Sequence, residues 1–145
     1  MITFSQLGKW GRLGNQLFEL ACCIGYAMEH EHEYMFPLWE YRQYFNLNNY
    51  SNQIQYTKIY NEPHFHYAKI PLFSQHEIID FRGFMQSIKY FENYQNIILG
   101  LLTPKDCYDK KWGTTSIHVR HGDYLNFTRE YEQLQMDYYI KAMDI

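Results

Sequence analysis

The chain has 145 residues, of which 46% are hydrophobic and 20% charged, and its formal net charge is −3. This balance is sufficient for a hydrophobic core, and it excludes a nucleic-acid binder with a broad basic face. No apolar run approaches the roughly 20 residues that cross a bilayer, and no signal peptide precedes the first predicted strand. We therefore expect a cytoplasmic protein without a membrane span.

The N-terminal pattern predicts a strand over residues 2–6, a glycine loop and a long amphipathic helix. Asn15 is a suitable N-cap for this helix. Its apolar residues recur at helical spacing: Leu17, Leu20, Ala21, Ile24, Ala27 and Met28. A strand followed by a glycine loop and a helix N-terminus is a common anion site. The loop lacks the spacing of a dinucleotide fingerprint and of a P-loop, and its two glycines could equally make a tight turn.

The middle of the chain predicts short elements. Residues 34–36 read as a second strand that ends at Pro37, and residues 41–60 read mostly as loop. A buried strand is expected over 78–84, followed by a helix over 87–102 that Thr103-Pro104 stops. The acidic run Glu29-His-Glu-His-Glu33 reads as a solvated face.

Histidines and cysteines do not favour a metal site. The pairs His30/His32 and His64/His66 have no further ligands at zinc-site spacing. Cys22 and Cys23 read as small core residues of the first helix, and three cysteines in total give no disulfide framework. We expect no metal cofactor.

The stretch Ser116-Ile-His-Val-Arg-His-Gly-Asp-Tyr-Leu125 carries the densest chemistry. It follows a polar segment over 105–114, and it reads as a strand over 115–119 that ends in a loop rich in cations. Arg120 can offer a planar fork of donors to phosphate oxygens, Gly122 lets the backbone approach a ligand, and Asp123 can fix the arginine or bind a hydroxyl. The alternative is a strand end with a surface salt bridge. A helix is then expected to begin near Leu134.

Four segments together resemble the GDP-fucose-dependent α-1,2-fucosyltransferases of glycosyltransferase family 11. These segments are Gly11-Arg-Leu-Gly-Asn-Gln16, Gly83-Phe-Met-Gln-Ser-Ile-Lys-Tyr-Phe91, His118-Val-Arg-His-Gly-Asp-Tyr124 and Leu134-Gln-Met-Asp-Tyr-Tyr139. The resemblance covers nearly the whole chain, and it is loose over residues 38–76. His121 stands where the family usually has a second arginine, which predicts weaker and more pH-dependent donor binding.

The resemblance implies an α/β fold, the Rossmann-like N-terminal half of a GT-B glycosyltransferase with the start of the donor-binding domain. We assign residues 1–104 to the acceptor-side domain, 105–114 to a linker and 115–145 to the start of the GDP-fucose-binding domain. Two such domains need far more than 145 residues. We therefore expect a truncated form that lacks its C-terminal half.

The implied activity is inverting transfer of L-fucose from GDP-fucose to the 2-hydroxyl of a galactoside, with no metal or other cofactor. The catalytic residues would be Arg120, which stabilises the leaving pyrophosphate, and Asp123, a candidate general base. The donor-binding residues would be Arg12, Gly14, Asn15, His118, Arg120, His121 and Gly122. Gln86 and Ser87 would line the cleft, although they could equally cap the helix that they precede.

The expected partners are GDP-fucose and a galactose-containing glycan, and a chain without a membrane span resembles the bacterial or viral members of the family. Two alternatives stay open. One is a non-catalytic remnant that needs a partner chain, and the other is a generic phosphate-binding α/β domain. Selective binding of GDP-fucose would separate the family interpretation from the generic domain.

Overall fold

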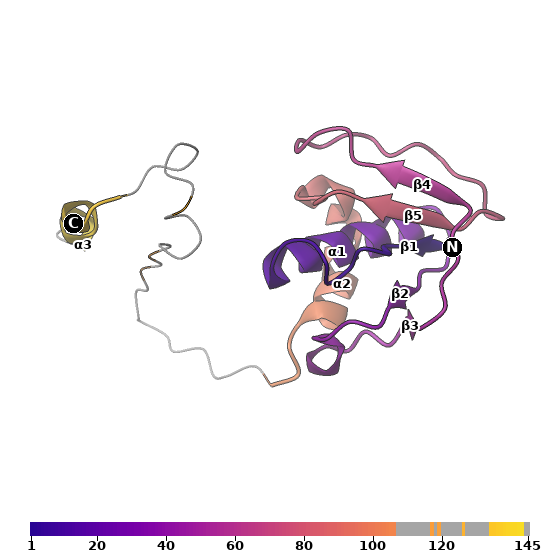
Figure 1. Ribbon diagram of the computed structural model, residues 1–145, viewed down its shortest axis with the longest axis horizontal. Coiled ribbons are helices and arrows are strands. Elements are labelled where there is room, and N and C mark those ends of the chain that lie inside the picture. Colours follow the sequence, from indigo (N-terminus) through magenta and orange to yellow (C-terminus); the bar gives the residue numbers. More distant parts are fainter. Residues whose placement is uncertain (107–116, 118, 120–125, 127–133, 144–145) are drawn as a thin grey trace. The chain divides into compact units, whose positions relative to one another are not determined.

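The structure is a computed structural model that describes residues 1–106, 117, 119, 126 and 134–143 (Figure 1). The chain divides into two units, Met1–Tyr108 and Asp109–Ile145, and each is described by itself. The described part of the first unit holds a parallel sheet, two α-helices and several short 3-10 turns, so the fold is mixed α/β.

The main sheet has three parallel strands in the order β1-β5-β4. The strands are β1 (Ile2–Thr3), β4 (Lys58–Asn61) and β5 (Ile79–Arg82). A second, two-stranded parallel sheet pairs β2 (Phe36–Pro37) with β3 (Tyr50–Ser51). A single bridge from Tyr34 to Ile2 lies between the two sheets. Because all these pairs are parallel, each return of the chain needs a crossover connection.

The helix α1 (Leu13–Glu29) supplies the largest apolar face of the unit. Its predicted stripe is confirmed, since Leu20, Ala21, Ile24 and Ala27 are buried while Leu17 and Met28 are partly buried against the core. The helix α2 (Gln95–Leu102) packs against α1, and Figure 1 shows both helices close to the sheet. Thr103 caps α2, as predicted from the following proline.

Aromatic rings fill the space between α1 and the sheet. Tyr26 of α1 meets Phe81 of β5 edge-on, with ring centroids 5.2 Å apart. Tyr60 of β4 and Phe73 also contact Phe81. A second stack, Trp39 on Phe45 at 5.4 Å, lies beside the smaller sheet. Among the described aromatic residues, seven are buried in the core, where large rings bury the most area: Phe4, Tyr26, Phe36, Trp39, Phe45, Phe81 and Tyr90.

Two predicted elements differ from the structure. The helix expected over 87–102 is broken into 3-10 turns, η2 (Ile88–Tyr90) and η3 (Glu92–Tyr94), and only its last eight residues form α2. The break lies at Phe91, whose φ of −148° is not helical. The second difference is β4, which falls in the region expected to be mostly loop.

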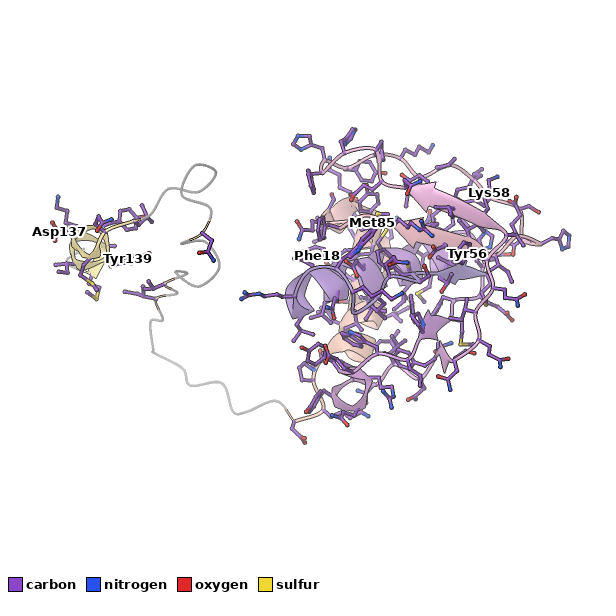
Figure 2. All side chains as sticks on the ribbon, in the orientation of Figure 1. Phe18, Tyr56, Lys58, Met85, Asp137 and Tyr139 are labelled. Carbon is purple, nitrogen blue, oxygen red and sulfur yellow. The ribbon has the colours of Figure 1, made fainter. Side chains whose placement is uncertain are left out.

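The strand β4 escaped prediction because it lies at the edge of the sheet and is mostly exposed. An exposed edge strand carries no alternating apolar pattern of the kind that identifies a half-buried strand. Lys58 of β4 and the neighbouring Tyr56 are labelled in Figure 2. A short 3-10 helix, η1 (Arg42–Tyr44), follows β2 and agrees with the short pieces expected there.

In the second unit the structure describes the helix α3 (Met136–Met143), which confirms the helix expected to begin near Leu134. Of the strand expected over 115–119, only Ile117 and Val119 are described. Neither belongs to a strand, and their exposed fractions are 47% and 46%. The expectation of a buried strand is therefore not confirmed at these two residues.

Candidate functional site

The candidate site lies at the carboxyl ends of the three parallel strands. The loop that leads from β1 to α1 contains Gly11 and Arg12, and the loop after β5 contains Gly83 to Ser87. Because β1 and β5 are neighbours and parallel, these two loops emerge at the same edge of the sheet. In open α/β sheets, ligands bind outside this edge.

A hydrogen bond joins two of the residues assigned to the site from the sequence. The side-chain amide of Gln86 donates to Oδ1 of Asn15 over 2.8 Å, although the residues are 71 positions apart. Asn15 also packs over Gly11, whose φ of +65° favours glycine. The structure therefore brings together the first two segments of the family resemblance.

Asn15 does not cap α1, which corrects the prediction. The helix begins at Leu13, its N-cap is Arg12, and no side chain caps it. Asn15 is in the first turn, where its side chain turns toward Gln86 instead of the backbone amides. Ser87 lies at the N-cap of η2 without a side-chain capping bond, so the capping alternative for Gln86 and Ser87 is not seen.

The buried side chain of Gln16 holds the glycine loop by a hydrogen bond to Gly11. Its Nε2 donates to the carbonyl of Gly11 over 3.2 Å, and its Oε1 accepts from Nε1 of Trp39 over 2.7 Å. Sequence reasoning assigned no role to this residue. The sequence feature that could have identified Gln16 is its position as a polar residue next to the apolar stripe of α1. A buried side-chain amide needs hydrogen bonds at both its oxygen and its nitrogen.

Glu62, which follows β4, holds the loop after β5. Its Oε2 accepts hydrogen bonds from the backbone amides of Phe84 and Met85, at 2.9 and 3.0 Å. Gly83 has a φ of +135°, and a Cβ there would run into the Glu62 side chain. Met85 is a non-glycine residue at φ +49° and is fully buried. Such backbone strain persists only where surrounding contacts impose it, and here it places Gln86 beside Asn15.

The N-terminus of α1 gives the site a positive character. The first intrahelical bond runs from the amide of Gln16 to the carbonyl of Arg12, so the amides of Leu13, Gly14 and Asn15 lie at the open end of the helix. Arg12 is exposed at this end. A methyl group at Gly14 would have nothing within 4 Å, so the surface above it is open. Backbone amides, a helix dipole and a guanidinium together suit a phosphate group.

Three ionisable residues of α1, Glu19, Cys22 and Cys23, are buried and do not take part in this surface. Burial raises the pKa of Glu19 to about 8, and neither carboxylate oxygen has a hydrogen-bond partner. Burial also raises the pKa of the Cys22 and Cys23 thiols. Thiols with raised pKa values are poor nucleophiles, so these cysteines are core residues, as predicted.

Five of the assigned residues lie outside the described residues, namely His118, Arg120, His121, Gly122 and Asp123. Arg12, Gly14, Asn15, Gln86 and Ser87 are described. Arg12 ends the loop before α1, Gly14 and Asn15 belong to the first turn of α1, and Gln86 and Ser87 come from the loop after β5. Within the described part of the chain, no group of three or more His, Cys, Asp or Glu side chains is placed to hold a metal ion. Nor does any helix described there have the length and apolar character to cross a membrane.

His32 departs from the solvated face expected for residues 29–33. It is buried, and both ring nitrogens lack a hydrogen-bond partner. The chain reverses at Glu31, which has a φ of +55°, and this reversal directs the next side chain toward the ring of Tyr26.

A comparison of the sequence and structure with protein-family models, curated proteins and solved structures finds no match.

Proposed function

We propose that this chain binds GDP-fucose and belongs to an enzyme that transfers L-fucose to the 2-hydroxyl of a galactoside. The observation that carries the proposal is the hydrogen bond between Asn15 and Gln86. It joins two segments that were assigned to one site because of their resemblance to α-1,2-fucosyltransferases. It does so at the carboxyl ends of parallel strands, where nucleotide ligands bind in α/β sheets. The fold would be the Rossmann-like N-terminal half of a GT-B enzyme.

In this proposal the described residues form one wall of the donor site. The open amides at the start of α1 and the guanidinium of Arg12 attract the pyrophosphate. Gly14 leaves room for close approach, and the Asn15–Gln86 pair offers amide groups to the sugar or ribose hydroxyls.

In this proposal the residues around Arg120 catalyse the transfer of fucose from GDP to the acceptor. As GDP leaves, negative charge grows on the β-phosphate, and a fixed guanidinium stabilises it most where it develops. Arg120 would supply this charge, with His118, His121 and Gly122 around the phosphates. Asp123 would take the proton from the 2-hydroxyl of the acceptor.

The described acidic residues near the strand ends do not compete for the role of general base. Glu62 is bonded to two backbone amides, and Asp80 is bonded to Ser5 and Arg82. A base must come within reach of the acceptor hydroxyl, whereas Asp80 is fully buried and Oε1 of Glu62, which has no hydrogen-bond partner, is buried as well.

The test is calorimetric titration of the full 145-residue chain with GDP-fucose, GDP and ATP. We expect selective binding of GDP-fucose and GDP that is lost in Arg120→Ala and reduced in Arg12→Ala. Lys58→Ala is the control, since Lys58 begins β4 at the opposite edge of the sheet. Equal affinity for ATP would support a generic phosphate-binding domain instead, and unchanged affinity in Arg120→Ala would remove that residue from the site.

Transfer is measured separately, by mass spectrometry of lactose incubated with GDP-fucose and the chain. Binding without transfer would favour a remnant or a chain that needs a partner. If a chain shown to be folded neither binds GDP-fucose nor transfers fucose, the proposal is overturned.

A further inference from the structure

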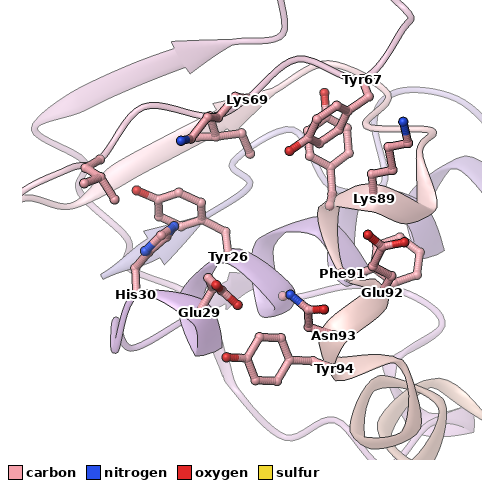
Figure 3. Close-up of a pocket in the computed structure, with 14 residues that line it drawn as sticks. Tyr26, Glu29, His30, Tyr67, Lys69, Lys89, Phe91, Glu92, Asn93 and Tyr94 are labelled. Carbon is pink, nitrogen blue, oxygen red and sulfur yellow. The ribbon is translucent and has the colours of Figure 1, made fainter.

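A pocket of about 400 Å³ opens on the side of α1 away from its N-terminus. Its walls come from the last turns of α1, the segment over residues 67–72 and the turns η2 and η3 (Figure 3). The volume lies within the range of small-molecule sites, about 300–1,000 Å³. Three of its lining residues, Lys89, Tyr90 and Phe91, end the segment over residues 83–91.

The pocket shares no lining residue with the candidate site, although Ser87 of that site directly precedes η2, one wall of the pocket. Gly25 lines the pocket and Asn15 belongs to the candidate site, and the two lie ten residues apart on one helix. At 1.5 Å of rise per residue, this places them about 15 Å apart along the axis. The inference below therefore does not rest on the proposed function.

The walls of the pocket are held by packing and by hydrogen bonds. A Cβ on Gly25 would lie 2.6 Å from Cβ of Phe91 and 2.8 Å from the carbonyl oxygen of Tyr90, so α1 and the 88–94 turns are in direct contact. The hydroxyl of Tyr90 accepts from the amide of Ala68 over 3.1 Å.

Tyr90 thus holds one end of the segment over residues 68–73, and Tyr26 holds the other end. Its hydroxyl donates to the carbonyl of Pro71 over 2.9 Å and accepts from the amide of Phe73 over 3.2 Å. Two buried tyrosines thus tie residues 68–73 to the helical elements on either side. A pocket that is formed before binding costs its ligand little ordering entropy.

The charges that line the pocket balance. The lining contains two cations, Lys69 and Lys89, and two carboxylates, Glu29 and Glu92, with His30 beside Tyr26. An anion would meet two carboxylates and a cation would meet two ammonium groups, so neither sign of ligand is favoured. Balanced carboxylates and ammonium groups, together with the amide of Asn93, offer both acceptors and donors to a neutral ligand with many hydroxyls.

Aromatic faces complete the chemistry. Tyr67 is 43% exposed, and Lys89 lies over its ring with Nζ 5.6 Å from the centroid. Tyr94 comes from the opposite wall, and in Figure 3 its ring lies near Glu29. A tyrosine ring presents a flat apolar surface with a polar tip, which suits the C–H face and the hydroxyl edge of a sugar ring.

We propose that this pocket binds a neutral saccharide. Tyr67 and Tyr94 contact the faces of the sugar, while Glu29, Asn93 and the lysines bond to its hydroxyls. The site is a binding site with no catalytic role.

The test is a titration of the isotope-labelled 145-residue chain, followed by amide chemical shifts in NMR. The probes are D-galactose, D-mannose, L-fucose, N-acetyl-D-glucosamine and lactose, with inorganic phosphate as the charged comparison. We expect saturable shifts at the amides of Gly25 and Asn93 with at least one sugar.

Two exposed pocket residues are replaced in Tyr67→Ala and Asn93→Ala, each expected to weaken binding by about tenfold. Tyr67→Phe keeps the ring and should retain most of the affinity. Tyr44→Ala, an exposed tyrosine outside the pocket, is the control and should bind like the parent. No saturable shift with any sugar, unchanged affinity in Tyr67→Ala, or saturation of the same amides by phosphate would overturn the proposal.

Discussion

Both carboxylate oxygens of Asp80 accept hydrogen bonds from Ser5. Oδ1 accepts from the backbone amide over 2.6 Å and Oδ2 from the hydroxyl over 2.8 Å, while Nε of Arg82 donates to Oδ2 over 2.9 Å. Asp80 is fully buried in β5, and Ser5 follows β1. This carboxylate therefore joins the two strands whose carboxyl ends carry the candidate site.

The first prediction concerns this carboxylate. Asp80→Ala leaves the amide and hydroxyl of Ser5 and Nε of Arg82 without this shared acceptor, while Nη2 of Arg82 keeps its bond to the Tyr56 hydroxyl. We expect the free energy of unfolding to fall by about 2 kcal/mol, because Asp80 is fully buried whereas the Arg82 side chain is 25% exposed and water can reach it. Urea denaturation followed by circular dichroism measures the change.

The control for Asp80 is Asp106→Ala, which removes an exposed carboxylate and should shift stability by less than about 0.5 kcal/mol. If both variants unfold at the parent's urea midpoint, the Asp80 network contributes no net stability.

The second prediction compares two helical glycines. Gly25→Ala places a methyl group against Phe91 and the Tyr90 carbonyl, and backbone cannot move aside as easily as a flexible side chain. We expect a loss of about 1–3 kcal/mol from overpacking. Gly100→Ala in α2 meets nothing within 4 Å and should gain about 0.5–1 kcal/mol, since alanine favours the helix. Thermal unfolding of both variants decides the matter, and equal midpoints would mean that α1 does not touch the 88–94 turns.

Local patterns predicted the elements whose residues face one apolar surface. The stripe through Leu20 and Ile24 identified α1, and the buried run around Ile79 and Phe81 identified β5. No local pattern marks the break at Phe91, a residue that packs closely against Gly25, 66 positions earlier in the chain. Contacts of this separation leave no periodic signal.

The site shows the same division. Glycine spacing and the polar residues Asn15 and Gln86 predicted two segments of the site. The parallel pairing of β1 with β5 brings these segments to the same edge of the sheet, at the carboxyl ends of the strands. Glu62 was missed because its role depends on the pairing of β4 with β5, and β4 itself was not predicted. The assignments of His118, Arg120 and Asp123 stay predictions, since these residues lie outside the described part of the chain.

The third prediction tests the proposed donor wall at Gly14. Gly14→Ala adds a methyl group to open surface in the first turn of α1, so helix stability should rise by about 0.5–1 kcal/mol. If the donor phosphates approach this turn closely, affinity for GDP-fucose should nevertheless fall by about tenfold. Calorimetry and urea denaturation on the same preparation separate the two effects. A more stable variant with parental affinity would show that the phosphates do not approach Gly14.

The fourth prediction concerns the end of α1. Glu31 follows the C-cap at φ +55°, and the amide of His32 bonds to the carbonyl of Ala27 over 2.8 Å, which forms a Schellman motif. Glu31→Gly removes the strain of a Cβ in the left-handed region, and we expect a gain of about 1 kcal/mol. Glu31→Ala removes the same charge but keeps the Cβ, so its stability is the reference. Equal stability of the two variants in urea would contradict the strained conformation.

The last prediction is a dependence of stability on pH that comes from Glu19. Burial without hydrogen-bond partners raises the pKa of this carboxyl to about 8, from an ordinary value of 4.5. Between these two values the folded chain keeps a proton on Glu19 that the unfolded chain has lost. The contribution of Glu19 to the free energy of unfolding is therefore fully present below pH 4.5 and falls as the pH rises toward 8. Glu19→Gln, which stays neutral, should remove this loss and raise the free energy of unfolding near pH 8 by more than about 1 kcal/mol.

His32 provides the internal comparison on the acidic side. Burial lowers the pKa of its imidazole below the ordinary 6.5, so the unfolded chain takes up a proton first as the pH falls. Its contribution is present above pH 6.5 and is lost on acidification, and Glu19→Gln should leave this loss in place. Urea denaturation across this pH range, on the parent and the variant, measures both slopes. Parallel curves for the two proteins would mean that Glu19 is ionised in the folded state, and that water or a cation reaches its carboxylate.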